Sequence, residues 1–183
     1  MSALVPDNLL SLGWVFLLAL AGFGMPLFSQ ASHPNAEMIA SCHELVLDYA
    51  TYRDQEDAEK FAGLFTADGS LSVMDLTFVG HKAIAARLAN KDGPTLRHMM
   101  TNIRITPVDT THATGVSYAL IYRGAKSGGP TMVANFTAMG EYFDDYQYSE
   151  EGCRFTQRKF IATFLPVTPA ELALPALPTN TSK

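Results

Sequence analysis

Three side chains that could move protons lie in two short segments of the sequence. Tyr49 and Asp54 belong to YATYRDQED, residues 49–57, and His98 belongs to RHMMTN, residues 97–102. A carboxylate, an imidazole and a phenol hydroxyl that meet in one apolar pocket can act as base, acid and hydrogen-bond donor on a carbon skeleton. The sequence therefore predicts acid/base chemistry with Asp54, His98 and Tyr49 as catalytic residues.

The segment that carries Tyr49 is predicted to be a helix over residues 36–53. Its apolar side chains recur at three- and four-residue spacing, which is typical of one helix face. They are Met38, Ile39, Cys42, Leu45, Val46, Tyr49 and Ala50. The Tyr49 ring lies on this apolar face and would fill core volume. Its hydroxyl could face a cavity, or it could only bond within the core.

Asp54 continues the ridge that contains Val46 and Ala50, so it would point inward at the end of this helix. A carboxylate there lies at the negative end of the helix dipole. The alternative is that the helix ends earlier, and that Asp54 begins a turn or pairs with Arg53 or Arg97.

His98 lies on a predicted strand over residues 96–107, where it alternates with Met100 and Asn102 on one face. If Asp54 is within reach, it would hold the imidazole in one tautomer or keep it charged. Met100 and Asn102 would then contact substrate. The alternative is a structural histidine bonded to a backbone carbonyl.

The other elements predict an α+β domain with three N-terminal helices and a curved antiparallel sheet. Asp57 can cap a second helix that ends at Asp68-Gly69, a strand follows over 71–80, and Gly80 leads into a third helix. Four runs rich in Val, Ile, Thr, Tyr and Phe are predicted to be hairpin-connected strands. They cover residues 96–107, 112–123, 131–146 and 153–165.

Composition excludes several function classes. The chain has 183 residues, 48% of them hydrophobic, which is enough for one domain with a sizeable core. Its net charge is −5 and its 13 basic residues are scattered, so no basic stripe predicts nucleic-acid binding. No metal-ligand spacing or phosphate-binding loop occurs, and we expect neither a metal nor a cofactor.

The two ends of the chain differ from the domain predicted over residues 35–166. Residues 9–28 are uncharged and long enough to span a bilayer, so residues 1–31 are predicted to be a signal peptide or a membrane anchor. We expect an exported or membrane-anchored protein, or a cytoplasmic one if the start codon is misassigned. Residues 167–183 are rich in proline and are predicted to be a disordered tail.

The two cysteines, Cys42 and Cys153, are far apart in sequence and could form one disulfide in an oxidising compartment. Cys42 lies on the apolar helix face, and free cysteine is among the most buried residue types. This preference favours two buried free thiols over a bridge.

The order and spacing of these segments resemble a known family. YATYRDQED, LFTADGSL, the Gly80 turn with KAIAARL, RHMMTN and GEYFDD follow one another as in the SnoaL-like branch of the nuclear transport factor 2-like superfamily. That branch includes scytalone dehydratase, bile-acid dehydratase and polyketide cyclases, and ketosteroid isomerase is a more distant relative. The resemblance covers residues 36–165 and implies a cone-shaped fold.

The resemblance also implies roles for single residues. In the dehydratases a tyrosine, an aspartate five residues later and a strand histidine line the cavity, and these positions look like Tyr49, Asp54 and His98. A further acid/base position on the next strand is similar to Ser117, which would contact substrate. Asp75 lies near the aspartate that shuttles protons in ketosteroid isomerase, so it is predicted to contact substrate or to serve as a reserve base.

Taken together, the sequence predicts an acid/base dehydratase, isomerase or cyclase that acts on a hydrophobic polycyclic, steroid-like or polyketide-like molecule. The alternative is a non-catalytic carrier of hydrophobic ligands, or a structural partner like the β subunit of a ring-hydroxylating dioxygenase. We also expect a homodimer formed by the outer face of the four long strands, because exposed apolar residues there would form a sticky patch.

Overall fold

The computed structural model describes residues 34–90, 93–126 and 134–166. In these ranges the chain forms three helices and six strands in the order α1, α2, β1, β2, α3, β3, β4, β5, β6. The α+β class predicted from the sequence is confirmed, and the order of helices and strands agrees with the prediction except that one predicted strand is two.

Helix α1 spans Pro34–Gln55 and extends the helix predicted over 36–53 at both ends. Its C-terminus is closed by Glu56, which has a positive φ of 57°. The Asp57 amide donates to the Tyr52 carbonyl at 3.0 Å, and the Glu56 amide donates to the Arg53 carbonyl at 3.3 Å. These paired bonds satisfy carbonyls that a helix end otherwise leaves free.

Helix α2, Ala58–Gly63, is capped as predicted, because Asp57 accepts a hydrogen bond from the Lys60 amide at 3.1 Å. The predicted end of this helix at Asp68-Gly69 is wrong. Strand β1, Phe65–Val73, already begins before that pair. A Cβ at Gly69 would lie 2.8 Å from the Phe155 carbonyl oxygen, so this glycine permits a close approach of two strands and does not form a turn.

The single strand predicted over 71–80 is a hairpin in the structure. β1 pairs antiparallel with β2, Leu76–Val79, and Met74 at the turn has a positive φ of 56°. Helix α3, Gly80–Ala86, follows at once and confirms the third predicted helix.

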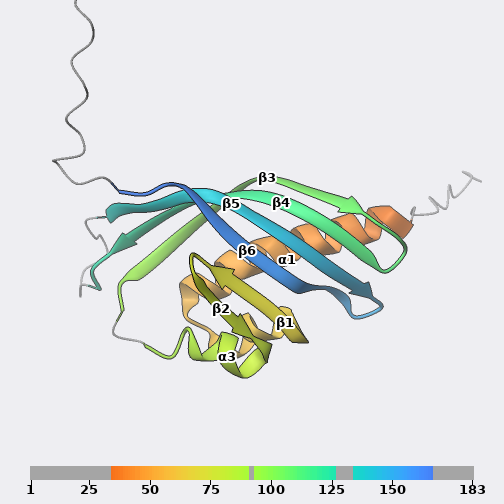
Figure 1. The fold of residues 1–183 in the computed structure, drawn as a ribbon, viewed down its shortest axis with the longest axis horizontal. Coiled ribbons are helices and arrows are strands. Elements are labelled where there is room, and N and C mark those ends of the chain that lie inside the picture. The colour runs from red at the N-terminus through yellow and green to blue at the C-terminus, as the bar shows by residue number, and fades with distance from the viewer. Residues whose placement is uncertain (1–33, 91–92, 127–133, 167–183) are drawn as a thin grey trace, which may run out of the picture. The chain divides into compact units, whose positions relative to one another are not determined.

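The four long strands are confirmed, each within a few residues of its predicted range. They are β3 (Thr95–Pro107), β4 (His112–Gly124), β5 (Ala134–Ser149) and β6 (Gly152–Phe164). The sheet order is β2-β1-β6-β5-β4-β3, and the sheet curves over α1 (Figure 1). It is not wholly antiparallel as predicted, because β1 enters it beside the last strand of the chain and runs parallel to β6.

The core lies between α1 and the inner face of the sheet. Successive strand residues alternate between the two faces, so each long strand supplies every second side chain to this core, except where a bulge shifts the alternation. The largest buried apolar side chains come from every layer: Met38, Val46, Tyr49, Phe61, Phe65, Leu71, Ile84, Leu88, Tyr142, Tyr146 and Phe155. The apolar face of α1 is therefore covered by strands that are distant in sequence.

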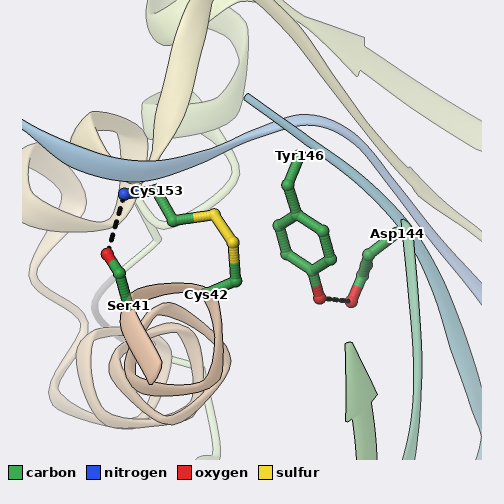
Figure 2. Close-up of a disulfide and its surroundings, with 5 residues drawn as sticks. All are labelled: Ser41, Cys42, Asp144, Tyr146 and Cys153. Atoms are coloured by element: carbon green, nitrogen blue, oxygen red, sulfur yellow. Dashed lines mark hydrogen bonds between the residues drawn. A yellow bond between two sulfur atoms is a disulfide. The ribbon is translucent and has the colours of Figure 1, made fainter. Parts of the chain in front are cut away.

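A buried ion pair joins β5 and β6 at this core. Arg158 is fully buried and donates to Asp144 at 3.2 Å. The Tyr146 hydroxyl donates to the same carboxylate oxygen at 2.9 Å (Figure 2). Burial raises the pKa of Asp144 to about 6, and the Arg158 charge opposes that rise. A Cβ at Gly115 would lie 2.7 Å from the Tyr146 hydroxyl, so this glycine makes room for the network.

The terminal predictions concern residues that lie outside the described ranges. Neither the predicted signal or anchor segment, 1–31, nor the predicted tail, 167–183, is described. Within residues 34–90, 93–126 and 134–166, no helix is both long and apolar enough to cross a membrane.

The prediction of two free buried thiols is wrong, because Cys42 and Cys153 form a disulfide (Figure 2). The bond joins α1 to the start of β6. In addition, the Cys153 amide donates to the Ser41 hydroxyl at 3.0 Å. Burial alone could not decide between thiols and a bridge, because the long-range packing of α1 on β6 brings the two Cα atoms to 5.0 Å.

The disulfide gives a stability prediction. It closes a long loop, since its cysteines are separated by 111 residues, and removing such a bridge should cost about 2–4 kcal/mol of unfolding free energy. We expect the double variant Cys42→Ala/Cys153→Ala to unfold at lower denaturant concentration than the wild type. Dithiothreitol should destabilise the wild type and leave the variant unchanged. Alkylation of both cysteines in the native protein before reduction would contradict the bridge.

Candidate active site

Two hydrogen bonds join Asp54 to His98. The carboxylate oxygen Oδ1 lies 2.6 Å from the ring nitrogen Nδ1 of His98, and Oδ2 accepts the His98 backbone amide at 2.8 Å. The His98 side chain is 5% exposed and that of Asp54 is 12% exposed. Asp54 can accept from Nδ1 only if this nitrogen carries a proton, so the carboxylate fixes both the tautomer and the orientation of the ring.

The local structure explains why Asp54 is in this place. The closure of α1 at Glu56 ends the helix just beyond Asp54. A carboxylate at a helix C-terminus is unfavourable beside the free carbonyl groups. The two donors of His98 compensate for this, because β3 packs along α1 and places them opposite the last helical turn. The predicted alternative pairings of Asp54 with Arg53 or Arg97 do not occur among the ion pairs of the described residues.

His98 lines a cavity of about 180 Å³, which we call the His98 cavity. Most of its wall is apolar and includes Leu96, Ile121, Ala138 and Phe160. An engineered cavity of about 150 Å³ in another protein is large enough for benzene. The His98 cavity therefore has room for the reacting ring of an apolar molecule, and a larger molecule must extend beyond it.

Within the described part of the chain, the second ring nitrogen of His98, Nε2, has no hydrogen-bond partner. Asp54 occupies Nδ1, so Nε2 is the nitrogen available to a molecule in the His98 cavity. A neutral imidazole protonated at Nδ1 is an acceptor at Nε2. The site therefore holds a histidine that is prepared to take up a proton.

Tyr49 also lines the His98 cavity, and its ring is 2% exposed. The Tyr142 hydroxyl donates to the Tyr49 oxygen at 3.3 Å, which leaves the Tyr49 proton for another acceptor. The Arg158 guanidinium lies 4.1 Å from the Tyr49 ring centroid and 3.9 Å from that of Tyr142. Burial raises the pKa of Tyr142 well above its ordinary value, so this hydroxyl stays a neutral donor.

The four residues predicted to contact substrate lie outside the wall of the His98 cavity. Met100 shares the inward face with His98 but packs against the core. Asn102 is exposed, because the register of β3 shifts between Thr101 and Arg104 and breaks the alternation there. Its backbone has a positive φ of 50° at this bulge.

Ser117 and Asp75 also have surroundings that the sequence did not reveal. Ser117 is 1% exposed on the inner face of β4, and its hydroxyl has no partner among the described residues. Asp75 is exposed at the turn between β1 and β2. Its neighbours Val73 and Met74 line the His98 cavity, so Asp75 lies close to its rim.

The sequence analysis missed three polar residues of the cavity wall, namely Thr137, Arg53 and Arg87. Thr137 is at a bulge in β5, and its buried hydroxyl lacks a partner in the described part of the chain. No periodic pattern marks such a position. The two arginines were counted among scattered basic residues, although Arg53 directly precedes Asp54.

Arg53 and Arg87 also line a second cavity, of about 200 Å³, together with Leu96, Glu56 and other residues. Burial, and next the nearby charge of Arg87, lower the pKa of Arg53. In residues 34–90, 93–126 and 134–166, no group of His, Cys, Asp and Glu side chains could hold a metal ion. Arg53 and Arg87 therefore place two positive charges at the edge of an apolar site.

Comparisons with known structures show the fold. A proposed scytalone dehydratase from Novosphingobium aromaticivorans superposes with a TM-score of 0.62 at 22% identity, covering 72% of this chain and 87% of that one. The hexachlorocyclohexane dehydrochlorinase LinA-type3 from Novosphingobium barchaimii gives 0.62 at 15% identity, covering 73% and 91%.

The β subunit of a proposed aromatic-ring-hydroxylating dioxygenase from N. aromaticivorans gives a TM-score of 0.59 at 17% identity, covering 70% and 91%. Similar structures also include a protein described as NTF2-like with a cystatin-like fold. Such low identities establish a common fold and leave the activity open. No curated protein matches the chain.

The family follows from a comparison with family models. The model of the SnoaL-like domain matches residues 34–159, which is more than half of the chain and includes α1, His98 and nearly all of the sheet. The resemblance inferred from YATYRDQED and RHMMTN is confirmed. The chain therefore belongs to the SnoaL-like domain family and has the nuclear transport factor 2-like fold.

Proposed function

We propose that this protein is an acid/base enzyme, a dehydratase or isomerase, in which His98 moves a proton on a hydrophobic ring compound. The observation that carries the proposal is the double attachment of Asp54 to His98 at the wall of an apolar cavity. The alternative is a structural histidine bonded to a backbone carbonyl, whereas here the ring nitrogen Nδ1 bonds to a carboxylate. Here the bonding leaves the other nitrogen at the cavity.

The proposed step begins with proton transfer from a substrate carbon to Nε2 of His98. In an isomerisation the C–H electron pair forms a double bond to the carbonyl carbon, and the carbonyl π electrons move onto oxygen to give an enolate. In an elimination the same pair forms a double bond to the neighbouring carbon as its C–O bond breaks and hydroxide leaves. His98 then returns its proton, to the departing hydroxyl as water in an elimination or to another carbon in an isomerisation. The Asp54 carboxylate stabilises the imidazolium, as the carboxylate does in serine-protease triads.

Tyr49 is proposed to stabilise the negative charge that develops on a substrate oxygen. Its proton is free because Tyr142 donates to its oxygen. A preorganised donor in a dry site gains strength as the charge develops. The buried, unpartnered hydroxyl of Thr137 is a second donor at the same cavity.

The size of the His98 cavity limits the reacting part of the substrate. About 180 Å³ suits one or two fused rings, by comparison with the engineered cavity that holds benzene. A steroid-like or polyketide-like molecule would have to continue into the second cavity, with which the His98 cavity shares Arg53, Arg87 and Leu96. The carrier alternative would be favoured if Asp54 and His98 were out of hydrogen-bond reach, and they are not.

A homodimer is proposed through the outer face of the long strands. Met99, Phe143 and Ile161 are 49%, 39% and 47% exposed, and each is flanked by an inward-facing residue of its strand. A large exposed apolar face marks an interaction site.

Analytical ultracentrifugation tests the dimer. The wild type should sediment as a dimer, and Phe143→Glu should sediment as a monomer because it places a charge on this apolar face. A monomeric wild type would contradict the dimer.

Export, with or without an anchor, is proposed for the cellular location. The Cys42–Cys153 bridge supports this, because disulfides persist mainly in oxidising compartments. The predicted signal or anchor segment, residues 1–31, agrees with it. Recovery of the native protein with reduced cysteines from the cytosolic fraction would contradict export.

The catalytic proposal is tested with the full chain and a panel of small ring compounds that carry a hydroxyl or an enolisable carbonyl group. In heavy water, mass spectrometry should show loss of water or uptake of deuterium into a compound. Asp54→Asn should lower this rate by about 100-fold or more, and His98→Gln should abolish it, since positioned proton transfer is worth about 100- to 10,000-fold.

The chain provides a matched control for these variants. His112 and Asp109 form a similar pair, with Nδ1 3.0 Å from Oδ2, but both side chains are about half exposed. Asp109→Asn and His112→Gln should leave turnover unchanged. Turnover that survives His98→Gln, or ligands that bind without any exchange or loss of water, would contradict an enzyme and favour a carrier.

A further inference from the structure

Two arginines lie together where the His98 cavity meets the second cavity. Arg53 is in the last turns of α1, and Arg87 follows the end of α3. Both residues, together with Leu96, line both cavities. The apolar wall around His98 therefore leads directly to a pair of guanidinium groups.

Neither guanidinium group has a carboxylate partner among the described residues. Asp54, the sequence neighbour of Arg53, is held by His98, and Glu56 forms an ion pair with Lys126 at 2.9 Å. Arg87 lies over the Phe78 ring at 5.3 Å, and its Nε atom is buried without a hydrogen-bond partner. Arg87 thus has an unused donor, and neither arginine occurs in the ion pairs of the described residues.

Two partly buried cations that face one cavity, with no counterion among the described residues, are unfavourable. The charge of Arg87 and burial both work against the charged form of Arg53. Buried charges are normally paired, because an unpaired charge loses its hydration without compensation. An anion between the arginines would remove this penalty, and guanidinium groups bind carboxylates through two parallel hydrogen bonds.

We propose that the substrate of the His98 site is a ring compound that carries a carboxylate, and that Arg53 and Arg87 bind this group. The inference rests on the proposed function for the position of the ring, which would occupy the His98 cavity next to Nε2. The carboxylate would lie at the junction of the two cavities. Arg53 and Arg87 then select acids over neutral compounds of the same shape.

The test compares β-naphthoate with β-naphthamide by isothermal titration calorimetry on the full chain. The two probes share their ring system and nearly their shape, but only the first is charged at neutral pH. We expect the wild type to bind the acid at least about tenfold more tightly than the amide, because charge-assisted bidentate bonds are about twice as strong as neutral ones.

Single variants assign the preference to the two arginines. Arg53→Met and Arg87→Met keep an apolar stem, and each should weaken acid binding about tenfold while amide binding stays within about twofold, since only the charged contact is lost. Arg123→Met is the matched control, because Arg123 is exposed, lines neither cavity and changes the net charge equally. It should change neither affinity.

Three outcomes would overturn the inference: equal affinity of the wild type for acid and amide, binding of neither probe, or equal weakening of both probes by the arginine variants. Repeating the titration with His98→Gln separates this inference from the catalytic one. If His98→Gln still prefers the acid and the wild type shows no turnover, the carboxylate site is supported and the catalytic proposal is contradicted. If the wild type turns over neutral compounds without preferring the acid, the catalytic proposal is supported and the carboxylate site is contradicted.

Discussion

The site depends on the two hydrogen bonds by which the Asp54 carboxylate holds His98. Asp54 accepts both the backbone amide and the Nδ1 proton of His98, so it fixes the strand and the ring at once. This requires that α1 ends just beyond Asp54 and that β3 runs beside that end. The positive φ of Glu56 and the paired bonds behind it meet the first condition. The proposed chemistry then follows from the nitrogen that Asp54 leaves free.

The rest of the core holds α1 in the position that the Asp54–His98 contact requires. The helix is fastened to the sheet in two places, by the Cys42–Cys153 bridge to β6 and by the Asp54–His98 contact to β3. Between them, the buried Arg158 guanidinium lies against the ring of Tyr49, which lines the same cavity as His98. Breaking a buried ion pair such as Arg158–Asp144 leaves an uncompensated charge, so this cluster resists distortion. Tyr49 is thus positioned from a strand far away in sequence.

Local patterns in the sequence predicted the elements, and long-range packing decided what the patterns could not. The periodicity of residues 36–53 placed Tyr49 and Asp54 on one helix face, and strand alternation placed His98 on the inner face. Asn102 left that face because of a bulge that no pattern marks. Cys42 and Cys153 had ordinary burial preferences, and only the packing of α1 on β6 joined them. Arg53 and Arg87 are distant in sequence, and only the tertiary fold brings them to the wall of one cavity.

The measurement that most directly tests the central claim is NMR of the His98 ring nitrogens in isotope-labelled protein, at a pH where the imidazole is neutral. The account predicts a proton on Nδ1 and an unprotonated Nε2, because Asp54 accepts from Nδ1. In Asp54→Asn this tautomer should lose its dominance. A proton on Nε2 in the wild type would contradict the account, since the cavity would then contain a donor in place of a base.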